Sequence, residues 1–96
     1  MAQNTNHFEK LTISSTAFSD YSKWNFNSQH LMIYVESKNP SDIIEYSFTG
    51  KENDVHGEIN PDFFRGIAFD DRICCIIFLR RKNPGQGVVV RIEAWK

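Results

Sequence analysis

The sequence predicts an all-β fold, an antiparallel β-sandwich or small barrel of about six to eight strands with an irregular N-terminal arm. Short apolar or alternating segments are separated by turn signals at intervals of about 8–12 residues, as in all-β domains. No long amphipathic helical pattern competes with them. A length of 96 residues corresponds to one domain. We therefore expect a flexible N-terminal segment over residues 1–7 and a single β-sandwich domain over residues 8–96.

The N-terminal third of the chain predicts one strand followed by an arm. Phe8 to Ile13 has the alternation of a first strand. Ser14 to Ser28 is rich in Ser and Asn but also contains aromatic residues, so it is too apolar for a free linker. We interpret it as an irregular arm or short strand that covers the core. Three of its aromatic residues are also spaced for one helical turn: Phe18, Tyr21 and Trp24.

The middle of the chain predicts three strands. His30 to Glu36 carries apolar residues on both faces, and Ile43 to Thr49 alternates between apolar and polar residues. Val55 to Ile59 follows a glycine-containing polar loop, which predicts a hairpin with the preceding strand. Asn39-Pro40 and Asn60-Pro61 mark the turns before and after this hairpin. Asp62 to Ile67 is compatible with a short helix or with an extended segment.

The C-terminal part contains the two strongest strand patterns, Ile73 to Arg80 and Val88 to Trp95. Asp70-Asp71 predicts a turn before the first of them. The connection Lys82 to Gly87 contains Pro and Gly, so we expect the two strands to form a hairpin. Its inner face would pack in the core and its rim would meet neighbouring molecules.

The net charge and the distribution of apolar residues argue against nucleic-acid binding, membrane insertion and secretion. The net charge is −1, so no basic excess is present to bind a nucleic-acid backbone through bulk charge. The longest apolar run, Ile73 to Leu79, is too short to span a membrane. No positively charged segment followed by an apolar run opens the chain, so no signal peptide is expected. These features predict synthesis in a cytoplasm and no contact with membranes.

The residues that most often carry chemistry do not form a known constellation. Cys74 and Cys75 are adjacent, and neighbours on a strand face opposite sides, so they do not suit one metal ion. We expect both to pack in the core. Asp70 and Asp71 with Glu93 resemble a glycosidase carboxylate pair in residue type, but adjacent aspartates are more typical of turns. Catalytic triads, phosphate-binding loops and zinc-protease motifs are also missing from the sequence. We therefore expect no enzyme activity, no cofactor and no metal site.

Surface contacts are the remaining source of function. The 13 large aromatic residues (eight Phe, three Tyr, two Trp) exceed what one small core needs, so some should lie at the surface or against a partner. The cationic cluster that begins at Arg80 suits either a carboxylate contact at an interface or a solvated strand end. The candidate interface residues are Trp24, Phe26, Arg80, Arg81 and Trp95.

Two further expectations concern the same residues. Arg80 and Arg91 would lie near each other across the C-terminal hairpin, each able to pair with Glu93 or Asp70. As an alternative function, exposed aromatic residues would stack on sugar rings in a carbohydrate-binding module. The aromatic residues concerned are Tyr21, Trp24 and Trp95.

Several segments together resemble small virion proteins of tailed bacteriophages. They are I-E-Y-S-F-T-G (Ile44 to Gly50), V-H-G-E-I (Val55 to Ile59), F-D-D-R (Phe69 to Arg72), I-F-L-R (Ile77 to Arg80) and V-V-V-R-I-E-A-W (Val88 to Trp95). The resemblance covers roughly residues 24 to 95. It implies a structural protein of a capsid, neck or tail, which binds other virion proteins and copies of itself. It implies no catalytic residue.

Overall fold

The computed structural model describes residues 6–18 and 20–95, with the side chains of residues 6, 7, 20, 22–29 and 70–75 outside the description. Within these residues the chain forms six β-strands and no helix, which confirms the predicted all-β class. The strands are β1 (Asn6–Ile13), β2 (Asp20–Val35), β3 (Ile44–Ser47), β4 (Gly57–Ile59), β5 (Gly66–Arg81) and β6 (Val88–Trp95).

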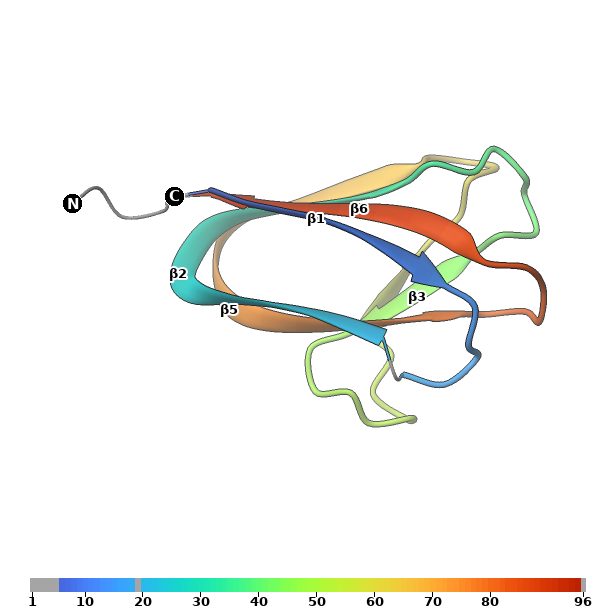
Figure 1. The fold of residues 1–96 in the computed structure, drawn as a ribbon, viewed down its shortest axis with the longest axis horizontal. Helices are drawn as coiled ribbons and strands as arrows, with labels where there is room; N and C mark the ends of the chain where they lie inside the picture. The colour runs from blue at the N-terminus through green and yellow to red at the C-terminus, as the bar shows by residue number, and fades with distance from the viewer. Residues whose placement is uncertain (1–5, 19, 96) are drawn as a thin grey trace.

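Two long strands give the molecule its two layers. The strand order is β1-β6-β2-β5-β3-β4, and every pair is antiparallel. Residues 30–35 of β2 pair with β6 and with the start of β5, whereas residues 20–23 pair with the second half of β5, next to β3. Figure 1 shows β2 and β5 curving together from the layer of β1 and β6 into the layer of β3. The register between β2 and β5 shifts twice between Lys23 and His30, in this curved region, as β-bulges do where strands bend.

We name the two halves of the sandwich by their strands. The first layer contains β1, β6, the second half of β2 and the first half of β5. The second layer contains the first half of β2, the second half of β5, β3 and β4. In the described strands β1 and β4 end the strand order and do not pair with each other, so the sheet does not close into a barrel.

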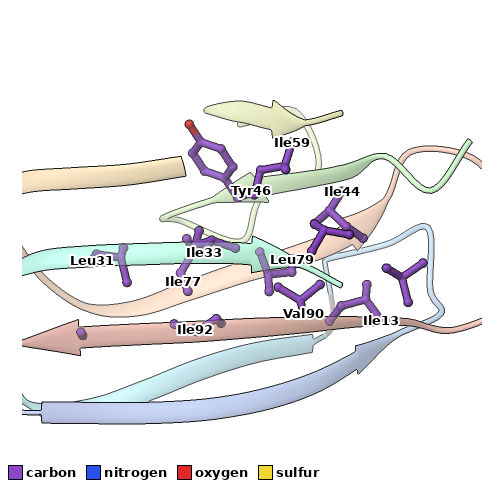
Figure 2. Close-up of a cluster of buried hydrophobic side chains, with 13 residues drawn as sticks. Ile13, Leu31, Ile33, Ile44, Tyr46, Ile59, Ile77, Leu79, Val90 and Ile92 are labelled. Carbon is purple, nitrogen blue, oxygen red and sulfur yellow. The ribbon is translucent and has the colours of Figure 1, made fainter. Parts of the chain in front are cut away.

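The core fills the space between the layers. Strand β6 alternates strictly, with Val88, Val90, Ile92 and Ala94 buried and the residues between them partly exposed. Figure 2 shows side chains from both layers meeting in this space. Most are isoleucine or valine, and β-branched side chains suit a pleated, half-buried surface. The core residues are Ile13, Leu31, Ile33, Val35, Ile44, Tyr46, Ile59, Ile77, Leu79, Val88, Val90, Ile92 and Ala94.

Several predicted elements are confirmed. Strand β6 has the predicted bounds, and β1 begins two residues before the predicted start. The predicted hairpin of the central region is present, because Ile44 of β3 pairs with Ile59 of β4. In the loop between these strands Gly50 has a φ of 76°, and a Cβ there would lie 3.0 Å from the Phe78 ring. Only glycine fits this position without strain.

Of the two alternatives for residues 14–28, an irregular arm or a short strand, the strand is right from Asp20 onward and the irregular arm is wrong there. These residues belong to β2, which is 16 residues long. The predicted turn at Asp70-Asp71 is also wrong, because both residues lie inside β5. Residues 20–23 pair with residues 76–79 of β5, and Asp70 pairs with His30 of β2, so tertiary pairing overrides the weak strand propensity of Ser and Asp.

The predicted C-terminal hairpin is wrong as well. Strand β6 pairs with β1 and β2, and β5 pairs with β2 and β3. The connection over residues 82–87 therefore crosses from the second layer to the first. A six-residue connection is long enough for this crossing, because packed layers lie about 10 Å apart.

The segment over residues 60–65 forms a turn, so the short-helix alternative is excluded. The Asn60 carbonyl accepts hydrogen bonds from the amides of Phe63 and Phe64, at 3.0 and 2.9 Å. The Asn60 side chain accepts a third from the Asp62 amide, at 3.0 Å. We call this segment the Phe63 turn.

Candidate contact surface

Arg80 lies on the outer face of the second layer, where its partners come from its own chain. Its Nε donates to Glu45 at 2.7 Å, and its Nη1 donates to Glu52 at 2.9 Å. The guanidinium also stands 4.1 Å from the centre of the Phe18 ring. Glu52 in turn accepts a hydrogen bond from the Phe18 amide. This cluster fixes two surface segments against β5, so Arg80 acts first as an internal clamp.

Arg81 points into the sandwich instead, and its side chain is only 3% exposed. It pairs with Asp42 at 2.9 Å, and it donates to the carbonyl oxygens of Asn83 and Gln86 at 2.8 and 2.7 Å. A Cβ on Gly85 would lie 2.4 Å from its Nη2, so the loop wraps closely around the guanidinium. Arg81 is therefore an internal residue, whereas a partner contact would place it at a surface.

The predicted neighbours Arg80 and Arg91 lie in different layers. Arg91 is on β6, where its Nη2 lies 3.7 Å from Glu93, and this pairing agrees with the prediction. Arg80 pairs with Glu45 and Glu52 rather than with Glu93. The Asp70 side chain lies outside the described residues.

The outer face of the first layer carries a row of alternating rings and guanidinium groups. The guanidinium carbon of Arg91, Cζ, lies 5.6 Å from the centre of the Phe8 ring and 5.9 Å from the centre of the Tyr34 ring. Arg65 lies 5.0 Å from the Tyr34 ring, and its Nη2 donates a hydrogen bond to the Tyr34 hydroxyl. We call Phe8, Arg91, Tyr34 and Arg65 the arginine–aromatic row. It crosses the layer from its edge strand β1, through β6 and β2, to the residue just before β5.

The Phe63 turn adds apolar surface beside Arg65, the residue that follows it into β5. Phe63 is 78% exposed and Phe64 is 46% exposed. The amide of Val35 donates to the Arg65 carbonyl at 2.7 Å, which ties this end of the turn to β2. An ordered turn that exposes two adjacent phenylalanines is a typical feature of a protein-contact surface.

The other predicted contact residues have mixed positions. Trp95 is half-buried on the outer face of β6, with its ring stacked on His30 at 5.4 Å between centroids. Trp24 and Phe26 belong to β2, and their side chains lie outside the described residues. Tyr21 is 49% exposed and lies 5.7 Å from Phe78, centre to centre.

Sequence reasoning missed most of the residues that form this surface. Phe63 and Phe64 lay in a segment of ambiguous structure, and their position after Asn60-Pro61 was the available signal for a displayed turn. Tyr34 and Arg91 each alternate with buried residues, which marks an outer face. Their mutual contact depends on the pairing of β2 with β6 and was not readable from either strand alone.

The described residues form neither a metal site nor a helical membrane span. Among the described side chains, those of residues 8–18, 21, 30–69 and 76–95, no group of three or more His, Cys, Asp or Glu residues is arranged to hold a metal ion. In the same part of the chain no helix is long and apolar enough to span a membrane. The side chains of Cys74 and Cys75 lie outside the described residues, so their core packing stays a prediction.

The fold and the surface together define an antiparallel β-sandwich with an arginine-rich and aromatic outer face. No protein-family model matches the chain, and a search of curated proteins finds no relative. Among solved structures, the chain is similar to the crystal structure of the SPBc2 prophage-derived protein YomS. The TM-score is 0.53 at 12% sequence identity, and the match covers 100% of this chain and 99% of that one. This likeness shows that a prophage-derived protein has the same fold.

Proposed function

We propose that the protein is a non-enzymatic structural component of a phage particle, in the capsid, neck or tail, and acts through protein–protein contacts repeated by symmetry. The observation that carries the proposal is the match of fold over the whole length of both chains with a prophage-derived protein. The sequence resemblance to small virion proteins of tailed phages points in the same direction. On this proposal the protein is made in the host cytoplasm and ends in the virion.

The surface gives the proposal a physical basis. Five large apolar side chains of the described residues are at least 40% exposed: Phe8, Tyr21, Val55, Phe63 and Phe64. When a neighbouring molecule covers exposed apolar surface, the burial contributes about 25 cal/mol of favourable free energy per Å². Repetition by symmetry then adds many such contacts, so each one can be weak.

The test is to purify particles produced from the genome that encodes this chain and to quantify the chain by mass spectrometry. The proposal expects many copies per particle, in a ratio to the major capsid or tail protein that matches a symmetric ring or shell. Normal infectious particles without the chain would refute it. Glycan-array screening of wild type and Tyr21→Ala separates the alternative: sugar binding that is lost in the variant would favour a carbohydrate-binding module.

A further inference from the structure

The arginine–aromatic row is held in place before any partner arrives. The Arg65 guanidinium is fixed by the Tyr34 ring and hydroxyl, and Arg91 lies between two rings. Side chains that are already ordered lose little rotamer entropy on binding. Tyr and Arg are also the residue types that most often dominate binding energy at interfaces.

The row carries positive charge that the described part of the chain only partly compensates. Arg91 has two carboxylates in range, with Glu36 at 3.9 Å from Nε and Glu93 at 3.7 Å from Nη2. For Arg65 no carboxylate of the described side chains lies within ion-pair distance. The Nε atoms of both arginines are buried and make no hydrogen bond. A carboxylate that reaches the guanidinium of Arg65 would therefore meet a cation without a competing ion pair.

Charge also decides which class of partner fits. A second copy that used the same face in a two-fold contact would bring a second Arg65, which has no ion pair among the described side chains, and no additional carboxylate for it, which is unfavourable. A nucleic acid would meet a chain whose net charge is −1 and only a few cations on this face. An acidic protein segment supplies the missing charge.

We propose that this surface binds a segment of another protein in which a carboxylate stands beside an apolar side chain. The carboxylate pairs with Arg65, and the apolar side chain packs on Phe63 at the edge of the row. This inference rests on the proposed function, in which the chain acts through contacts with other proteins, and it names the chemistry of one such partner.

The experiment selects binders for the immobilised full chain from a random 12-residue peptide library in ribosome display. The expected peptides are enriched in Asp or Glu next to an apolar residue. Arg65→Gln and Phe63→Ser are each expected to weaken their binding about tenfold or more, as hot-spot changes do. The matched controls Lys51→Gln and Val55→Ser, on the loop between β3 and β4, should change binding by less than about twofold. Phe63 is 78% exposed, so Phe63→Ser keeps the fold even if Arg65→Gln does not.

Three results would overturn the inference: no selected peptide, selected peptides without acidic residues, or binding that both Arg65→Gln and Phe63→Ser leave unchanged. Light scattering adds a fourth. A concentration-dependent dimer that Phe63→Ser abolishes would make the occupant a second copy. The peptide selection does not require phage particles, so the two proposals can fail separately. If the chain binds acidic peptides but is missing from particles, only the proposed function is refuted.

Discussion

Two adjacent arginines on β5 show how strand alternation divides similar residues between different tasks. Arg80 lies on the outer face and holds Glu45 and Glu52, whereas Arg81 faces inward and holds the loops at one end of the sandwich. Asp42, the carboxylate partner of Arg81, also accepts a hydrogen bond from the Ser37 hydroxyl at 2.6 Å. The predicted anion contact is therefore made inside the chain by both arginines.

Arg81→Met is expected to lower the free energy of unfolding by about 3–5 kcal/mol, because it leaves the partly buried Asp42 carboxylate without its cation. Lys82→Met is the matched control. Lys82 is 46% exposed on its side chain and pairs with Glu58 at 3.4 Å, so the change should stay within about 0.5 kcal/mol. Urea denaturation followed by circular dichroism measures both. Equal effects of the two substitutions would contradict the internal role of Arg81.

Strand β6 is the element that joins sequence pattern and packing most directly. It lies between β1 and β2 in the sheet, and every second side chain enters the core. Its outward side chains include Arg91, the member of the row on this strand, and Trp95, which stacks on His30. One strand thus stabilises the sandwich with one face and presents the contact surface with the other.

This division gives a test within a single strand. Ile92→Ala should destabilise the protein by about 2–5 kcal/mol, because Ile92 is fully buried and its truncation leaves a cavity. Val89→Ala, on the outer face of the same strand, should cost less than about 1 kcal/mol. Thermal unfolding of both variants distinguishes the faces. A larger cost for Val89→Ala would show that the strand faces the other way.

The short strands were predictable from sequence and the long ones only in part. β3, β4 and β6 have clear alternation and flanking turn residues, which act locally. β2 and β5 run through segments rich in Ser, Asn and Asp, and their continuity comes from pairing with each other. Strand order was not predictable either, because the local signal of the 82–87 connection fits a hairpin and a crossing equally well. The arginine–aromatic row joins residues of neighbouring strands, so it could not be predicted without the strand order.

Taken as a whole, the molecule is a small sandwich whose two outer faces differ. Residues 15–18 and the loop over residues 48–56 approach the outer face of the second layer, where Arg80 and Glu52 link them. The first layer presents the row and, beside it, the Phe63 turn. This difference assigns the first layer, rather than the second, to contact with partners in our proposal.

The most direct test of this account replaces Phe63 by a photoreactive residue in assembled particles. With Phe63→p-benzoyl-phenylalanine, irradiation should attach the chain to a different particle protein, at a peptide that contains Asp or Glu. Val55→p-benzoyl-phenylalanine, whose site is 40% exposed in the loop between β3 and β4, should attach it much less. Incorporation into particles with no attachment from position 63, or with attachment only from position 55, would contradict the account.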